Sequence, residues 1–584
     1  VAGIFSALAI VQFGQVAQVQ ADGAIGSSTH KGSLAINGTW KAGYSNAKAT
    51  DENAIAIGQD AQATGRGGVA LGNETRSVQN ALAAAWDAQA TSKNAVALGT
   101  GTRAMGLSST AVGAGAQATV YGAVALGTGT RATGLSSTAV GDSAQATADG
   151  AVALGQSTES AGNSVAAGYN AKARSNNTVA IGVEANNDGG ITNNASSVSV
   201  GVATRARAVG SMAMGVSADA SGKYSLALGS GDVSGDYTDG NNHPSASGEK
   251  SIAIGYNSNA SDESDIALGD SSKAKGGASI SIGKDSKAED QNAVAIGVDS
   301  HAKTIDSIAV GNNAKATGAV STALGARAEA LGTSAVAVGI NAKAKKDQAT
   351  ALGFSAQANE KNSVALGYSA ISSQENAVAL GSASTTTTNA TSQGSFVIGG
   401  KTITWNGAPT VTGTGMQVSV GSAGAERQIK NVAAGAVSPN STDAINGSQL
   451  YAVADALRTK YVSIKSNATG TSSNENNDGA TGTDSIAIGP KASATQPNAT
   501  ALGKGAGATD SNSTAIGTGA QATGSSSVAL GDSANASSSQ AIAIGKSTVA
   551  SQYDAVAIGN GSKATASYTL ATNGGAASGL MSIS

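Results

Sequence analysis

Basic side chains recur at one spacing in the middle of this chain, and they are its best candidates for binding chemistry. They stand at fourteen-residue intervals, interrupted once by Glu329, at Lys273, Lys287, His301, Lys315 and Lys343. Residues at equal spacing occupy equivalent places in a repeated structure, so these side chains would stack in a row. Like charges that stand this close repel each other. The row therefore predicts a site for an anionic polymer or an acidic protein surface, with an ordinary solvated face as the alternative.

Catalytic and metal chemistry find little support in the sequence. There are no cysteines, which excludes disulfides, thiolate metal sites and cysteine nucleophiles. The three histidines, His30, His243 and His301, stand in or beside expected turns, without an acid and a nucleophile at recurring spacing. Turns near Asp232 and Asp236 offer carboxylates for calcium, but the nonapeptide pattern of calcium-binding β-rolls is missing. We therefore predict no enzymatic activity, no cofactor and no metal site.

A glycine that returns every fourteen residues provides the frame for the basic row. It recurs without a slip from residue 255 to residue 381, and the same period is found around residues 99–155 and 489–559. Self-similarity at a fixed period is typical of a stacked solenoid. We assign a structural role to this glycine column, taking as its reference members Gly255, Gly269, Gly283, Gly297 and Gly311.

Within each coil the side chains alternate in a way that predicts two short strands. Large aliphatic residues stand eleven and thirteen positions after the glycine, as Ile280 and Ile282 do. A period of two places both on one face of a strand. A second alternation surrounds the basic position, as in Ser286-Lys287-Ala288. We expect an all-β fold of parallel coils, each with two strands of about five residues, whose thin core packs large aliphatics against small residues.

The predicted outer faces of the coil differ in character. The basic position should face water. The position between the two aliphatics would also face outward, yet it is a ladder of small residues such as Ala253, Ala267, Ala295 and Ala309. Soluble monomers avoid a continuous uncharged strip on their surface. We therefore expect the alanine ladder to be buried in an oligomer, whose chain number and handedness the spacing leaves open.

The first part of the chain divides into a leader and a long repeat array. Residues 1–21 carry no charge, and Val19 and Ala21 match the last positions before a signal-peptidase cut, so we read a truncated signal peptide, with an apolar strand or helix as the alternative. No twenty-residue apolar stretch follows, so no membrane helix is predicted. The first head spans residues 22–395. In it, the interval between successive glycines of the column is longer than fourteen residues at two places, 182–201 and 229–255.

These long intervals predict loops extruded from the coil. Repeat insertions often gather on a binding face, so Asp236 and Tyr237 in the second loop are candidate ligand-binding residues; tolerated surface insertions are the alternative.

The remainder of the chain predicts a connector, a neck and a second head. We place a β-rich connector at 396–430, the neck and a short coiled coil at 431–460, a linker at 461–484, and a second head at 485–584, truncated because the repeat is still in phase where the chain stops. A helix is expected from residue 441, capped by Ser441 or Thr442. Asn446, Leu450 and Leu457 follow a coiled-coil spacing with Val453, and an asparagine in such a seam commonly fixes register and chain number.

Two sets of motifs together resemble a known family. The SVALG and AIAIG strands with an A-x-A strand between them, and the segment VAAGAVSPNSTDAINGSQLYAVADAL, are similar to the heads and neck of YadA-like trimeric autotransporter adhesins of bacteria. The resemblance implies a left-handed parallel β-roll, a homotrimer, and a bacterial cell-surface location with an outer-membrane anchor outside this chain.

The same resemblance implies an adhesive function. Members of the family attach bacteria to collagen, fibronectin or laminin, to host cells, or to like molecules on other cells, and many weak contacts along a rod would add up by avidity. A net charge of −3 gives no argument for a nucleic-acid partner. One alternative is a passive spacer that presents another tip. The other is a β-solenoid acyltransferase, which the fourteen-residue period disfavours, since those enzymes have six-residue rungs and a catalytic histidine.

Overall fold

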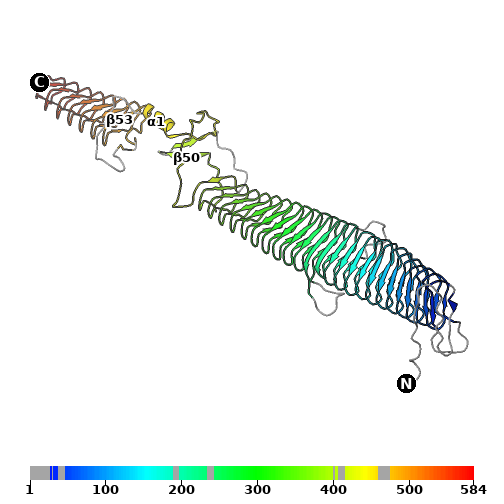
Figure 1. The fold of residues 1–584 in the computed structure, drawn as a ribbon. Coiled ribbons are helices and arrows are strands. Elements are labelled where there is room, and N and C mark those ends of the chain that lie inside the picture. The colour runs from blue at the N-terminus through cyan, green and yellow to red at the C-terminus, as the bar shows by residue number, and fades with distance from the viewer. Residues whose placement is uncertain are drawn as a thin grey trace. The chain divides into compact units, whose positions relative to one another are not determined.

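The computed structural model describes residues 27–28, 30–36, 46–187, 196–232, 242–398, 401–405, 415–457, 474–475 and 477–584. The chain divides into two compact units. The first comprises Val1–Thr391 and Thr410–Gln428, and the second comprises Ser392–Pro409 and Ile429–Ser584. Each unit contains one β-roll, visible in Figure 1 as a stack of coils.

Each coil contributes one two-residue strand and one longer strand, of three residues except in β26 (Met212–Val216) and β28 (Leu226–Ser230), and each pairs in parallel with its equivalent in the next coil. β33 (Lys273–Ala274) pairs with β35 (Lys287–Ala288), and β34 (Ile280–Ile282) pairs with β36 (Val294–Ile296). The predicted all-β solenoid of parallel fourteen-residue coils is confirmed. The strands are shorter than the five residues predicted, because each turn takes up more of the coil.

The first roll forms two long sheets. The two-residue strands run from β1 (Ser27–Ser28) to β49 (Thr385–Thr386), and the three-residue strands from β2 (Leu34–Ile36) to β48 (Val378–Leu380). The second roll extends from β53 (Ile486–Ile488) and β54 (Ser493–Ala494) to β65 (Leu570–Thr572) and β66 (Ala576–Ala577), again as two sheets.

Strand pairing continues across the two long intervals between glycines. β22 (Val179–Ile181) pairs with β24 (Val198–Val200), and the five-residue β28 (Leu226–Ser230) pairs with β30 (Ile252–Ile254). The strands on either side of each long interval therefore keep the parallel register of the other coils.

The interior of the coil is lined by small side chains, which reverses our prediction for the three-residue strand. Ala295 and Ala309 are fully buried, whereas Ile308 and Leu324 on the same sheet are 38% and 45% exposed. The alternating pattern was read correctly, but the large aliphatics point outward and the alanine ladder points inward. The reason is steric. The two strands of a fourteen-residue coil lie so close together that the space between them is filled almost entirely by alanine, serine and threonine, with Asn187 a larger exception.

The glycine column lies where successive coils come closest. At Gly283 the backbone has φ +127°, a conformation that side chains of L-residues rarely adopt, and a Cβ there would lie 2.6 Å from the carbonyl oxygen of Gly297. The same region of φ, +121° to +136°, is found at all five reference positions: Gly255, Gly269, Gly283, Gly297 and Gly311.

The C-terminal end of the first roll is covered by a returning segment. β52 (Val418–Ser419) extends the sheet of three-residue strands by pairing with β48. Nη1 of Arg427 donates hydrogen bonds to the hydroxyl of Ser384 at 2.9 Å and to the carbonyl of Val420 at 2.6 Å, and Nη2 donates to the carbonyl of Ser382. The arginine thus ties this segment to the last glycine turn.

The second unit also holds a hairpin and the one helix found among the described residues. β50 (Ser395–Ile398) and β51 (Lys401–Thr404) pair antiparallel. α1 (Gly447–Ala456) begins later than predicted, because its N-cap is Asn446 rather than Ser441 or Thr442. No helix in the described ranges is long and apolar enough to cross a membrane.

The start of α1 is a capping box tied to the preceding chain. The side chain of Asn446 accepts a hydrogen bond from the backbone NH of Gln449, and the Gln449 side chain accepts one from the Asn446 NH. Asn446 also donates to the carbonyl of Val432 at 3.0 Å. Asn446 therefore serves as the helix cap in this chain, and the apolar positions that follow it, Leu450, Val453 and Leu457, are exposed.

Candidate binding faces

The sheet of three-residue strands presents a continuous apolar surface, which we call the aliphatic face. Two side chains per coil point outward on it, and in both rolls many of them are more than one-third exposed, among them Leu268, Ile308, Leu324, Leu352, Leu380, Leu502, Leu530 and Ile558. A solvent-exposed apolar strip of this length is unusual for a soluble monomer.

Covering the aliphatic face would be strongly favourable. Complete burial of a valine, leucine or isoleucine side chain contributes about 1.5–3 kcal/mol. These side chains are already partly covered by their neighbours, so each would gain roughly 1 kcal/mol on the same scale. Each coil supplies one or two such residues, since threonine takes one outward position in coils such as those of Thr322 and Thr350, and repetition along a roll makes this face suited to contact with another apolar surface.

The sheet of two-residue strands carries the basic residues. Lys273 and Lys287 are direct partners in the parallel ladder, followed by His301 and Lys315 in the next two coils. The structure adds Lys275 and Lys303, which stand two residues after the basic position, on the same outer side of the sheet. We call the exposed set Lys273, Lys275, Lys287, Lys303 and Lys315 the basic face.

Two carboxylates stand on this sheet, Glu329 within the row and Glu289 beside it, and each lies close to a basic side chain. His301 Nε2 lies 3.0 Å from Glu289 Oε2, and Lys343 Nζ lies 3.2 Å from Glu329 Oε2. Among the described residues, no ion pair involves the five lysines of the basic face. Lys343, predicted as part of the row, is therefore separated from it by Glu329.

The remaining carboxylates of these coils lie in the turns. Asp285 and Asp299 have left-handed backbone conformations in one turn, and Asp306 has one in the other. Lysines therefore outnumber carboxylates on the sheet of these coils, whereas the turns carry mostly carboxylates, together with Lys284. Lys275 and Lys303 were not predicted, because the prediction rested on one position of the repeat, although they follow Lys273 and His301 by two residues in each case.

The corresponding face of the second roll is almost uncharged. At the positions equivalent to the lysine row it has Ser493, Gly507, Gln521, Asn535 and Val549, with a single lysine, Lys563. Two residues after each of these positions, just past the strand, it has only threonine and serine, at Thr495, Thr509, Thr523, Ser537, Ser551 and Thr565.

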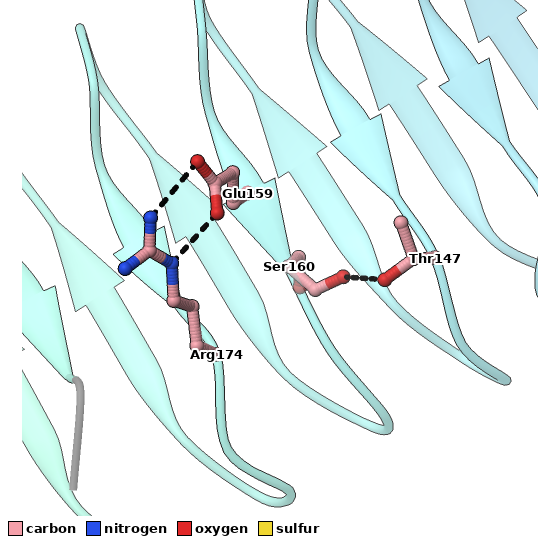
Figure 2. Close-up of polar contacts among 4 residues, drawn as sticks. All are labelled: Thr147, Glu159, Ser160 and Arg174. Carbon is pink, nitrogen blue, oxygen red and sulfur yellow. Dashed lines mark hydrogen bonds and ion pairs between the residues drawn. The ribbon is translucent and has the colours of Figure 1, made fainter.

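A second polar feature of the first roll is a small notch, and Figure 2 shows the polar contacts among four of its lining residues. Arg174 makes a two-pronged contact with Glu159, at 2.7 Å from Nε and 3.1 Å from Nη2, and the Thr147 hydroxyl donates to the Ser160 carbonyl at 3.4 Å. The hydrogen bonds from Arg174 lower the pKa of Glu159 below its usual value. The notch encloses about 100 Å³, and its two charges neutralise each other.

The other predicted site residues do not assemble into a centre. Asp236 and Tyr237 lie outside the described residues. At the base of their loop, Asp232 accepts hydrogen bonds from Asn242 at 2.8 Å and Tyr256 at 2.9 Å, which lower its pKa. Within the described ranges, no three histidine or acidic side chains come together to hold a metal ion.

Comparison with protein families identifies the repeat and the neck. The model for the coiled stalk of trimeric autotransporter adhesins matches residues 428–479. The model for the YadA head domain repeat (2 copies) matches residues 45–75, 86–102, 104–130, 132–158, 160–185, 206–231, 246–272, 274–300, 305–328, 330–356, 358–384, 480–506, 498–520, 508–534, 522–548, 536–562 and 550–572.

Individual relatives cover shorter stretches. The autotransporter adhesin BtaE of Brucella suis biovar 1 (strain 1330) is 56% identical over 50 residues, which are 9% of this chain and 7% of that protein. The collagen-binding domain of the Yersinia adhesin YadA is 28% identical, covering 36% of this chain and 87% of that structure, with a TM-score of 0.20. A C-terminal YadA-like domain from Burkholderia pseudomallei is 41% identical, covering 17% of this chain and 46% of that structure, with a TM-score of 0.15.

The head-repeat matches alone account for more than half of the chain, so most of it is built from YadA-type head repeats. The stalk match follows the first roll at the neck, in the order expected from the sequence. The chain belongs to the family of YadA-like trimeric autotransporter adhesins.

Proposed function

We propose that three copies of this chain associate through their aliphatic faces into the rod of a bacterial surface adhesin. The observation that carries the proposal is the unbroken aliphatic face, which a single chain leaves exposed in both rolls. The helix supports it, because Leu450, Val453 and Leu457 are 61%, 52% and 77% exposed at coiled-coil spacing. Family membership supports both the trimer and a location at the outer-membrane surface.

The rod would act by attachment rather than by catalysis. Its targets would be extracellular matrix proteins such as collagen, fibronectin or laminin, host cell surfaces, or like molecules on neighbouring cells. Equivalent coils offer the same contact many times, so weak individual contacts would sum to firm attachment.

The association can be tested within the second roll by a matched pair of variants of the full chain. Leu502→Glu, Ile516→Glu and Leu530→Glu together place three carboxylates on the aliphatic face. Thr495→Glu, Thr509→Glu and Thr523→Glu add the same charge to the opposite, exposed face. Sedimentation equilibrium should give a trimer for the parent and the control. The aliphatic-face variant should dissociate at its second roll, which would then be cut more readily by protease. A monomeric parent, or equal behaviour of the two variants, would contradict the proposal.

The adhesive role requires a binding measurement on the same preparation. The trimer should attach to at least one of immobilised collagen, fibronectin and laminin, to a host cell monolayer, or to beads coated with the chain itself. A trimer that attaches to none of these would favour the passive spacer.

A further inference from the structure

We infer that the basic face binds a linear, negatively charged polysaccharide that lies along the axis of the first roll. The inference deepens the proposed adhesive function, on which it rests, by naming the chemical class of one ligand. Its starting point is the arrangement of Lys273, Lys275, Lys287, Lys303 and Lys315, which are exposed and, among the described residues, without an ion-pair partner.

The placement of these lysines disfavours the unbound state. Lys273 stands directly beside Lys287 in the ladder, at the spacing of neighbouring strands, about 4.8 Å. Like charges at directly paired positions destabilise a sheet. Other coils carry glutamine, asparagine or serine at the same position without harm to the fold, at Gln145, Asn259 and Gln357, for example. The fold therefore does not require lysine here, and a bound anion would remove the repulsion.

The geometry of the face fits a linear ligand. Lys273 and Lys315 are three coils apart, which corresponds to about 14 Å along the roll. Lys275 and Lys303 lie beside this row, with Glu289 in the coil between them at 3.0 Å from His301, so the positive charges form a narrow band parallel to the axis. The carboxylates of the turns flank the band, and they would confine a polyanion to its centre.

The chemistry of the face favours a polysaccharide over other polyanions. The outward positions of these four coils hold only lysine, histidine, glutamate and threonine: Lys273, Lys275, Lys287, Glu289, His301, Lys303, Lys315 and Thr317. Proteins that bind single-stranded nucleic acid use aromatic side chains to stack bases, and this face has none. Protein interfaces centre on buried apolar and aromatic anchors, which are also missing. The lysines alone can bind the sulfate and carboxylate groups along a sugar chain, without aromatic or apolar contacts.

The test uses the full chain and a five-fold variant, Lys273→Gln, Lys275→Gln, Lys287→Gln, Lys303→Gln and Lys315→Gln. A control removes the same charge elsewhere, with Lys361→Gln, Lys491→Gln, Lys504→Gln, Lys546→Gln and Lys563→Gln. A third variant replaces the five lysines of the basic face by arginine. Binding to immobilised heparin, hyaluronan, neutral dextran and single-stranded DNA is measured at several salt concentrations.

We expect the parent, the control and the arginine variant to bind heparin in a salt-sensitive way and not to bind dextran. The five-fold glutamine variant should lose about tenfold or more in affinity, because five exposed charge pairs are lost together. Binding to hyaluronan as well would show that carboxylates suffice. Equal binding by the glutamine variant, an equal loss in the control, salt-insensitive binding, or tighter binding of DNA than of heparin would overturn the inference.

The trimer and attachment measurements separate this inference from the proposed function. If the parent is trimeric and attaches to a matrix protein but not to heparin or hyaluronan, the inference fails and the adhesive role stands. If the parent is neither trimeric nor adhesive, the proposed function fails, whatever its affinity for heparin.

Discussion

The two rolls share one interior and one aliphatic face, yet they differ at the sheet of two-residue strands. Both are lined by fully buried alanines such as Ala295 and Ala529, and both leave leucines such as Leu324 and Leu530 exposed on the opposite sheet. The first roll carries the basic face, where the second has mostly serine, threonine and amides. The interior and the aliphatic face are therefore alike in the two rolls, while the outward residues of the two-residue strands differ.

The largest expected effect concerns the shared interior. Ala295→Asp in the first roll and Ala529→Asp in the second should each cost several kcal/mol of unfolding free energy, because a carboxylate would be buried without a partner. Denaturant unfolding of the full chain followed by circular dichroism checks this. Ala295→Ser is the control, since Ser281 occupies the same column one coil earlier. Tolerance of aspartate in only one roll would show that the two interiors differ.

The next prediction transfers the distinguishing feature from one roll to the other. Gln521→Lys, Thr523→Lys, Asn535→Lys, Ser537→Lys and Val549→Lys, introduced into the glutamine variant of the basic face, should restore salt-sensitive heparin binding. The gain should be about tenfold, since the same number of charge pairs is regained. Five lysines placed instead in turns of the second roll provide the control. No gain would mean that the first roll contributes more than its lysines.

A smaller effect is expected at the end of the first roll. Replacing Arg427 by methionine should cost roughly 1 kcal/mol locally, because its hydrogen bonds to Ser384 and to the carbonyls of Ser382 and Val420 are partly replaced by water. Hydrogen exchange should become faster at β48 and β52 and stay unchanged in the second roll. Unchanged exchange at β52 would show that strand pairing alone holds the segment.

The smallest effect belongs to the ion pair of Glu159 and Arg174. The hydrogen bonds lower the folded-state pKa of Glu159, so its contribution is present above the ordinary carboxyl pKa and is lost as pH falls through the folded value. Because the pair is about two-fifths exposed, Glu159→Gln should cost under about 1 kcal/mol at pH 7. The difference between parent and variant should shrink in acid. A difference that grows in acid would contradict this sign.

The fold could be predicted from the sequence more completely than the candidate site. The period of the glycines and the alternation around Ile280 and Ile282 predicted parallel coils with two strands. The same period predicted the basic row. Lys275 and Lys303 could be added only after the structure showed that they lie on the same outer side of the sheet as the row. The start of α1 was predicted too early, because a local cap at Ser441 was considered without the reciprocal bonds between Asn446 and Gln449.

The sequence by itself determined the period, the parallel stacking and the positions of the turns, because these depend on local backbone preferences that recur every fourteen residues. It did not determine which side of the three-residue strand faces inward. Alternation separates two faces, and hydrophobicity alone would bury the larger residues. The tertiary structure reverses that choice. The two sheets of a coil approach so closely that alanine fills the interior, and isoleucine and leucine remain on the outer side of the sheet.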